Sequence, residues 1–396
     1  MTGNRCFLGT ITALGLFLAA GSAPAQQKMT PAQVKALAGQ INASGYTSHK
    51  ICGQCHQDIH KAWSESAHAR AVTDPAFQAA LKESEEKHGK DSRKLCLACH
   101  APTTRFTHAT DLQDPLVQEG ITCDFCHTVK SVNLERTDNP FEMIPGKVKY
   151  GPFEYAPSPA HTTAFSLLHR NKPTFCAGCH EYRAANGFPA LTTYTEWKAS
   201  PFPVLGVSCQ DCHMALVQGD VVRKDVKIRD TGSYNFVNLH RLVGGGSLGQ
   251  LRRGLDLKVL VAEPRGEDGY VEVEIGNGAA GHKIPTGLPS KQLVLIVRAL
   301  SDGKETYSQT RVYERKLVDA NGAAVKSDGD LFLAAAKVVS DNRLAPKEKR
   351  KETFRFHLAS GAVKAEVTLA YRYHAPGAAE PKILTIARET RELRRP

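Results

Sequence analysis

Five short segments of the chain repeat one arrangement, in which two cysteines stand three positions apart and a histidine directly follows the second. The two cysteines can form thioether bonds to the two vinyl groups of one haem, and the histidine then falls beneath the porphyrin as the proximal iron ligand. The pattern therefore predicts five covalently bound c-type haems. The predicted thioether cysteines are Cys52, Cys55, Cys96, Cys99, Cys123, Cys126, Cys176, Cys179, Cys209 and Cys212, and the predicted proximal ligands are His56, His100, His127, His180 and His213.

Other uses of paired cysteines explain this pattern less well. A Cys-x-x-Cys pair alone can be half of a zinc site, a redox dithiol or part of a disulfide framework. None of these needs a histidine directly after the second cysteine, and histidine makes up only 16 of the 396 residues. The repeated histidine therefore favours haem attachment at all five copies.

The first 25 residues have the pattern of an export signal. Arg5 supplies a positive charge, residues 7–20 are an apolar run, and Ala23-Pro24-Ala25 fits a cleavage site before Gln26. We expect an exported protein, in the periplasm or alternatively outside the cell. Of the 11 cysteines, Cys6 would leave with the signal, and the five motifs use all the others, so no thiol remains for a disulfide or for catalysis.

The remaining composition limits the possible partners. No later segment approaches 18 consecutive apolar residues, so we expect no transmembrane segment in the mature chain. The formal net charge is +11, and a basic balance can indicate nucleic acid or a membrane surface. Five haems with their propionates would however contribute roughly −5 when ferric and −10 when ferrous. Nucleic-acid binding is therefore not expected.

A histidine-containing phrase, Trp63-Ser64-Glu65-Ser66-Ala67-His68-Ala69, follows the first motif. On an ideal helix from His56, His60 would lie on nearly the same face, whereas His68 would lie about 120° around the axis and point elsewhere. Motif and phrase together resemble the cytochrome c554 family of multihaem electron carriers. The resemblance implies that His68 is the distal ligand of a different haem.

Eleven further histidines are available for the five distal positions, against three methionines of the expected mature chain. We therefore expect bis-histidine ligation to dominate and potentials to be low, because methionine ligation is what raises them. Asn238 to Gly245 resembles another distal-ligand phrase of multihaem cytochromes. The candidate distal ligands are His68, His161 and His240, then His169 and His282, with His108 and His49 behind them. The sequence does not assign each of them to a particular haem.

Residues 26–254 form the predicted haem domain, which leaves roughly 45 residues for each large apolar cofactor. Porphyrins must then form much of its core, in a mainly helical and irregular fold that should not form without haem.

We expect a helix to begin near Ser158 and to continue to His169. Gly120-Ile121-Thr122 and Gly206-Val207-Ser208 lead into the third and fifth motifs, which favours duplicated haem pairs or, alternatively, chance similarity.

The pattern changes at about Leu255. Apolar residues then alternate, as in 255–261, 271–275 and 363–373, and turn pairs such as Asn277-Gly278 separate these runs. Roughly seven short strands predict an all-β sandwich over residues 255–396. The loop 277–287, which contains His282, resembles a loop of β domains appended to multihaem cytochromes. The chain is thus expected to be multidomain, with a signal peptide (1–25), a pentahaem c554-like domain (26–254) and a β-sandwich domain (255–396).

These features predict a pentahaem cytochrome that carries electrons between redox partner proteins, with no catalytic residue. Two alternatives stay open. If one haem lacks a distal ligand, the protein would be an oxidoreductase for a small nitrogen or sulfur compound. Alternatively, it would self-associate as a subunit of an extracellular cytochrome filament, with the His282 loop as the docking part. The resemblance to the c554 family departs in haem number, which is five here and four there.

Overall fold

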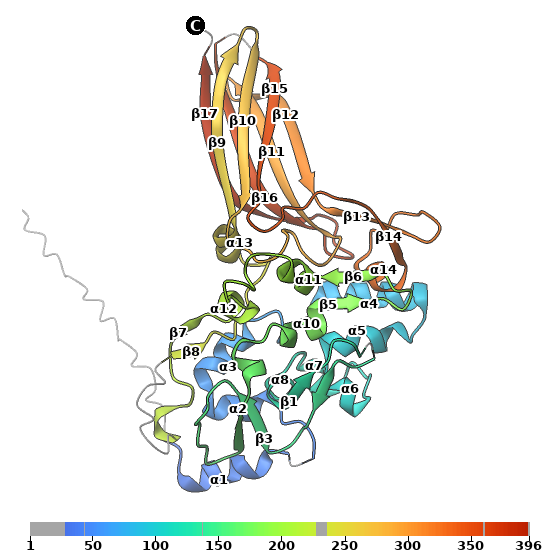
Figure 1. Cartoon of the computed structure of the whole chain (residues 1–396), viewed down its shortest axis with the longest axis vertical. Coiled ribbons are helices and arrows are strands. Elements are labelled where there is room, and N and C mark those ends of the chain that lie inside the picture. The colour runs from blue at the N-terminus through green and yellow to red at the C-terminus, as the bar shows by residue number, and fades with distance from the viewer. Residues whose placement is uncertain (1–27, 43, 137, 227–235, 359–360, 395–396) are drawn as a thin grey trace, which may run out of the picture.

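The computed structural model describes residues 28–42, 44–136, 138–226, 236–358 and 361–394. The expected signal peptide lies outside these residues. The chain has a helical part, drawn in blue and green, and a long strand-rich part, drawn in yellow to red, that rises from it (Figure 1). Within the described residues no helix is long and apolar enough to cross a membrane.

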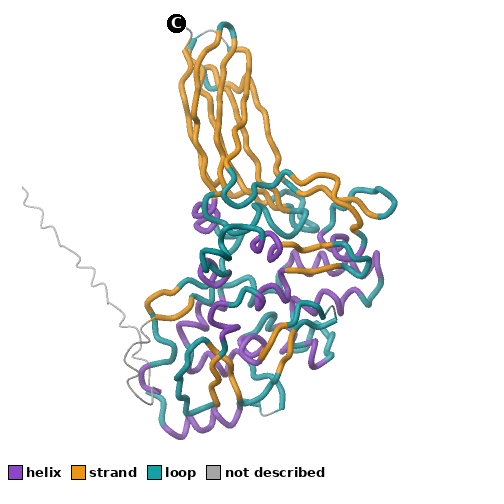
Figure 2. The backbone as a smooth tube through the Cα atoms, in the orientation of Figure 1, coloured by secondary structure: helices purple, strands orange, loops and turns teal. Residues whose placement is uncertain are grey.

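The helical part consists of short helices joined by irregular segments (Figure 2). Polar caps start several of them, because an Asp or Ser side chain accepts the free N–H groups of the first turn, as Asp74 does from Ala76 and Ser48 from Lys50. The helices are α1 (Pro31–Gln40), α2 (His49–Cys55), α3 (Gln57–Ser64), α4 (Pro75–His88), α5 (Ser92–His100), α6 (Thr104–Thr107), α7 (Pro115–Gln118), α8 (Cys123–Thr128), α9 (Leu167–Asn171), α10 (Thr174–His180), α11 (Thr193–Lys198) and α12 (Cys209–His213).

Small two-stranded ribbons connect these helices. They are β1 (Val129–Val132) with β2 (Phe141–Met143), β3 (Val148–Gly151) with β4 (Thr162–Phe165), β5 (Glu181–Arg183) with β6 (Pro189–Thr192), and β7 (Leu216–Gln218) with β8 (Phe236–Asn238). The expected helix from Ser158 to His169 is wrong over β4. The β-branched Thr162 and Thr163 pair in parallel with Val148 and Lys149 of β3 instead, and the chain becomes helical only at Leu167.

The strand-rich part is a sandwich of two antiparallel sheets. One has the order β15-β10-β9 and the other β12-β11-β16-β17. Their bounds are β9 (Leu255–Arg265), β10 (Asp268–Asn277), β11 (Lys291–Ser301), β12 (Lys304–Tyr313), β15 (Lys349–His357), β16 (Ala362–Tyr373) and β17 (Lys382–Arg394). The alternating apolar residues of β10, β11 and β16 fill one large core between the sheets. The strands are longer than expected, because turn residues such as Asp302-Gly303 lie only at their ends.

A layer of smaller elements lies between the sandwich and the helices (Figure 1). It holds α13 (Leu248–Gly254), β13 (Arg315–Asp319), α14 (Asp328–Leu333) and β14 (Ala335–Asp341). The 3-10 turn η1 (Lys224–Val226) belongs to the helical part, where Asp225 accepts from the backbone N–H of Met29 (2.7 Å). Asp330 of α14 forms an ion pair with Lys87 and a hydrogen bond with His88 (2.7 Å), both at the end of α4. These two bonds tie the two parts of the chain together.

The two parts should differ in their need for cofactor. The sandwich has a continuous core of its own, whereas the buried apolar clusters of the helical part are small, such as the one around Leu97 and Val117. We expect chain produced without haem attachment to lose residues 28–254 in limited proteolysis while 255–394 stay protected, because burial of apolar surface is the main source of stability. Mass spectrometry of the fragments measures this. A protected, compact helical part would contradict it.

Candidate haem sites

Backbone carbonyl oxygens hold most of the histidines that the motifs predict as proximal ligands. In four of the five motifs the Nδ1–H of the histidine donates such a bond, which leaves Nε2 free to bind iron. The pairs are His56 with Val221 (2.6 Å), His100 with Ala71 (2.8 Å), His127 with Tyr150 (2.6 Å) and His213 with Val243 (2.5 Å). The acceptors come from other segments of the chain, so the surrounding fold fixes how each ring is turned.

Four proximal histidines also face a second histidine at one common spacing. The distances between ring centroids are 6.2 Å for His56 and His161, and 6.3 Å for His127 and His240, for His180 and His68, and for His213 and His282. A metal–imidazole bond of about 2 Å on each side places two ring centroids roughly 6 Å apart. Each pair therefore has the spacing that one iron between two imidazoles requires.

The facing histidines are themselves oriented and kept neutral. Nδ1 of His240 bonds to the carbonyl oxygen of Asn238 at 2.6 Å, and Nδ1 of His282 bonds to that of Lys283 at 2.9 Å. Burial lowers the pKa of His68, His161 and His240 to about 4. At neutral pH these rings are therefore unprotonated, which is the form that binds a metal.

His100 differs from the other four proximal histidines. The described residues include all 16 histidines, and among them none faces His100 at the common spacing. The neighbouring ring is Phe77, whose centroid lies 4.0 Å away and whose plane is within 19° of the imidazole plane. An iron bound to an imidazole lies in the plane of that ring, so a ring stacked on its face is beside the ligand and not across the iron. Phe77 thus supports His100 from the proximal side.

His169 lies beside a proximal ligand instead of opposite it. Its ring stacks on His127 with centroids 5.6 Å apart, and its Nε2 bonds to the carbonyl oxygen of Cys126 at 2.8 Å. That bond occupies Nε2 of His169, while its buried Nδ1 has no hydrogen-bond partner among the described residues. Of the lesser candidates, His49 bonds to His60 at 2.8 Å, and His108 is exposed at the end of α6.

The two tryptophans of the chain hold the third and fifth motifs in the same way. Trp63 Nε1 donates to the carbonyl oxygen of Ile121 at 3.0 Å, and Trp197 Nε1 donates to that of Val207 at 3.1 Å. The glycines before these residues, Gly120 and Gly206, both have positive φ, 65° and 69°, which favours glycine. The two lead-ins therefore share a backbone shape as well as a sequence pattern.

The motifs approach one another through their cysteines. Three pairs of cysteine side chains from different motifs lie beside one another, namely Cys52 with Cys123, Cys99 with Cys179, and Cys176 with Cys209. Cys126 lies close enough to Cys176 and Cys179 to raise their pKa. The fourth motif therefore has the second, third and fifth motifs as neighbours, while the first motif adjoins the third.

The loop that carries His282 is fixed to both parts of the chain. The fully buried Asn277 donates through Nδ2 to the carbonyl oxygens of His282 (2.9 Å) and Leu344 (3.2 Å). Gly281 lies against the Trp197 ring, where a Cβ would come within 2.9 Å of Cδ1. A larger side chain at position 281 would therefore push the loop away from the fifth motif.

A buried ionic cluster completes this attachment. Glu196 of α11 accepts from the backbone N–H of Lys283 (3.2 Å) and the hydroxyl of Thr286 (2.9 Å). Arg343, which is only 6% exposed, forms ion pairs with Glu196 (2.9 Å) and with Asp341 (2.8 Å). These bonds connect the His282 loop to a helix of the haem-motif part, so they position this histidine opposite His213.

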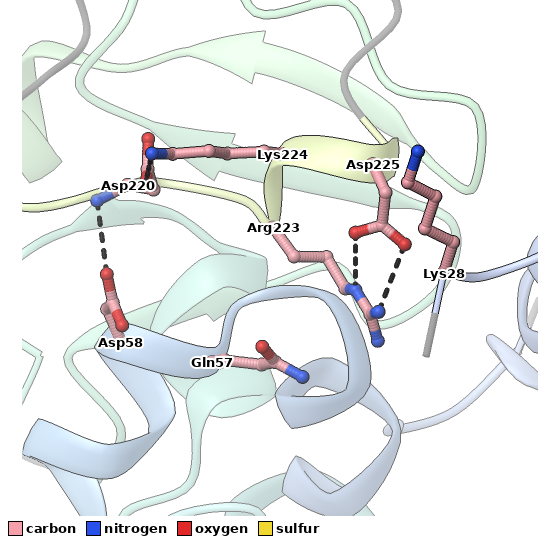
Figure 3. A pocket seen from close by; sticks show the side chains of 7 residues that line it. All are labelled: Lys28, Gln57, Asp58, Asp220, Arg223, Lys224 and Asp225. Carbon is pink, nitrogen blue, oxygen red and sulfur yellow. Dashed lines mark hydrogen bonds and ion pairs between the residues drawn. The ribbon is translucent and has the colours of Figure 1, made fainter. Parts of the chain in front are cut away.

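A hollow of about 260 Å³ lies beside the first motif (Figure 3). Its charged groups are mostly paired with one another, as Arg223 is with Asp225 (2.7 Å) and Lys224 with Asp220 (3.8 Å). The backbone N–H of Arg223 also donates to the carbonyl oxygen of Cys55 (2.9 Å). The lining therefore fixes the segment whose Val221 orients His56.

The comparisons with known proteins agree with this geometry. Residues 51–128 match the family model described as cytochrome c554 and c-prime. The structure is similar to a penta-heme cytochrome c552 from Thermochromatium tepidum, with a TM-score of 0.70 and 22% identity over 87% of this chain and 98% of that one. No curated protein matches the sequence.

Two further solved structures share only about a third of the chain. They are a β-glucosidase from Kluyveromyces marxianus (8% identity, 35% of this chain and 15% of that one, TM-score 0.16) and the N-terminal domain of PorA (9% identity, 35% of this chain and 95% of that one, TM-score 0.17). Likenesses this low carry no argument. The chain thus resembles the cytochrome c554 family over residues 51–128 and shares the fold of a penta-heme cytochrome, with a helical part followed by a strand-rich C-terminal part. The predicted resemblance and fold class are confirmed.

Two substitutions test whether His240 or His169 would bind the iron opposite His127. We expect His240→Ala to convert one low-spin haem to high-spin, because it removes the ring that faces His127 across the iron position. His169→Ala should leave the spin count unchanged, because its Nε2 is already bonded to Cys126. Low-temperature EPR of the two oxidised holoproteins gives the counts. The reverse result would make His169 the ligand.

The ionic cluster behind His282 predicts an effect on stability. Arg343→Met should cost about 3–5 kcal/mol of unfolding free energy, because it leaves the buried carboxylate of Glu196 without its cationic partner. Arg298→Met removes an exposed pair with Glu305 and should change it by less than about 1 kcal/mol. Denaturant unfolding of the holoproteins compares the two variants. Equal effects would mean that the cluster is not important for the attachment.

Proposed function

We propose that the protein is an exported pentahaem c-type cytochrome that carries electrons between redox partners. The observation that carries the proposal is the repeated 6.2–6.3 Å spacing of four histidine pairs, each of which contains the proximal histidine of one motif. We assign His161, His240, His68 and His282 as the distal ligands opposite His56, His127, His180 and His213. The ten motif cysteines attach the five haems, and a bound haem supplies reversible one-electron chemistry.

The arrangement of the motifs supports a continuous electron path. Haems attached at neighbouring cysteines have adjacent edges, so the thiol contacts imply the order first, third and fourth motif, with branches from the fourth to the second and to the fifth. The solved structure with a TM-score of 0.70 is described as a penta-heme cytochrome, which supports the count of five. Partner proteins then deliver and remove electrons at the outer haems. Export to the periplasm fits this role.

A second function is favoured by the histidine that has no facing partner. The haem attached at Cys96 and Cys99 would have His100 on one side and no histidine on the other. Such an open metal position can bind a small nitrogen or sulfur compound. In that case the other four haems would supply or remove electrons for an oxidoreductase reaction there.

The filament alternative has less support. The His282 loop faces His213 of its own chain, and the ionic cluster of Glu196 and Arg343 holds it there. This internal use leaves the loop unavailable to a neighbouring molecule.

We also place the domain boundary between Gly254, where α13 ends, and Leu255, where β9 begins.

The test is a count of spin states in the oxidised holoprotein by low-temperature EPR and optical spectroscopy. We expect four low-spin haems and one high-spin haem, because four proximal histidines have a facing partner and His100 has none. A high-spin signal that shifts on adding nitrite, hydroxylamine or nitric oxide would support the oxidoreductase function. Five low-spin haems would rule out the open position, and several high-spin haems would contradict the assigned pairs.

A further inference from the structure

The side chain of Arg105 lies against the second haem motif. Arg105 belongs to α6, and its Nε donates to the carbonyl oxygen of Ala98 at 2.6 Å. Ala98 directly precedes Cys99, and the guanidinium group also lies beside the Cys99 side chain. A thioether bond to Cys99 would therefore attach the edge of a haem within one residue of this cation.

Among the described residues, no carboxylate forms an ion pair with Arg105. Its Nη1 donates to the backbone carbonyl oxygen of Asp138 at 2.8 Å, and its Cζ lies 5.8 Å from the centroid of the Phe141 ring. The carboxylate of Asp138 pairs with Arg136 instead, at 3.4 Å. An arginine side chain stays protonated at any accessible pH. The second motif thus has a permanent positive charge hydrogen-bonded to its backbone.

Two other cations beside the haem motifs are paired with acids. Arg93, in the first turn of α5, binds Glu85 through two hydrogen bonds, and the bond from its Nη2 to Oε2 is 3.1 Å long. Lys149 forms an ion pair with Asp124, an interior residue of the third motif that is only 1% exposed. Such pairs contribute little net field at a haem, because their opposite charges largely cancel. Arg105 differs from both, since its partners are two carbonyl oxygens and an aromatic ring.

Phe141 connects the guanidinium group to two further motifs. Its ring is 3% exposed and packs edge-to-face on Phe125 of the third motif, with centroids 5.2 Å apart. The same ring lies against Gly178 of the fourth motif, where any Cβ would overlap it. The charge of Arg105 is therefore held at the place where the second, third and fourth motifs meet.

We propose that Arg105 raises the reduction potential of the haem attached at Cys96 and Cys99. This inference rests on the proposed function, in which those cysteines attach a haem and a redox partner supplies its electrons. Reduction makes the haem more negative by one charge, and a fixed cation nearby stabilises the more negative state where solvent screening is incomplete. Arg105 therefore favours the reduced form of the haem whose proximal ligand, His100, has no facing histidine among the described residues.

The test is a redox titration of the holoprotein in which the EPR signal of the high-spin haem is followed at each potential. Arg105→Gln should lower the midpoint potential of that haem, whereas Arg105→Lys should keep it closer to the wild-type value because the charge remains. Arg136→Gln is the matched control, since it removes an arginine that also binds Asp138 but is exposed and paired. This control should shift no haem. If Arg105→Gln gives no holoprotein, Arg105→Met provides the same comparison.

An unchanged midpoint of the high-spin haem in Arg105→Gln, an equal shift of all haems, or the same shift in Arg105→Lys would overturn the role of the charge. A wild-type protein without a high-spin signal would instead refute the open position of the proposed function. The charge is then tested on the optical components of the titration. One of them should shift in Arg105→Gln, and it should be the component that His100→Met also alters. No shift, or a shift of any other component, would overturn the proposal.

Discussion

On the proposed assignments, the fold of the helical part depends on the fixed distance between two imidazole rings that bind one iron. Four pairs of histidines meet this distance, and each pair joins segments that are far apart in the sequence, such as His68 after α3 and His180 at the end of α10. Short helices and two-stranded ribbons cannot enclose a large side-chain core, and the apolar clusters between them are correspondingly small. On these assignments, iron ligation and porphyrin burial replace the packing that holds an ordinary helical domain together.

The sequence predicts the covalent half of each site but not the pairing of the ligands. Cysteine and histidine spacing within a motif is local chemistry, so the attachment points can be read from five residues at a time. The partner across the iron is decided by tertiary structure. The sequence ranks His240 ahead of His169 but cannot place either of them, whereas the structure shows that His240 faces His127 at the common spacing and that His169 is bonded to the Cys126 carbonyl. The hydrogen bond of His88 to Asp330 of α14 is likewise not predicted by a local pattern.

The β domain shows the same division between local and long-range information. Alternating apolar residues indicate its strands and turn residues their ends, and the two-sheet sandwich follows from that pattern. Nothing local indicates that Glu196 of the first domain and Arg343 of the second share a buried ion pair, because neither side chain is unusual in its own segment. On the proposed assignments, this ion pair matters because it attaches the sandwich to the helical part at the position where the haem of the fifth motif would bind.

The position of His282 also determines the order in which the protein can be completed. A chain is made and exported from its N-terminus, and all five motifs precede residue 282. On the proposed assignments, the haem at Cys209 and Cys212 is attached while its second ligand is still absent. Its iron gains that ligand only when the last domain has folded and docked. On these assignments, docking of the β domain is the last step of maturation. It changes the coordination of one iron from five ligands to six, so the spectrum of that haem reports the step.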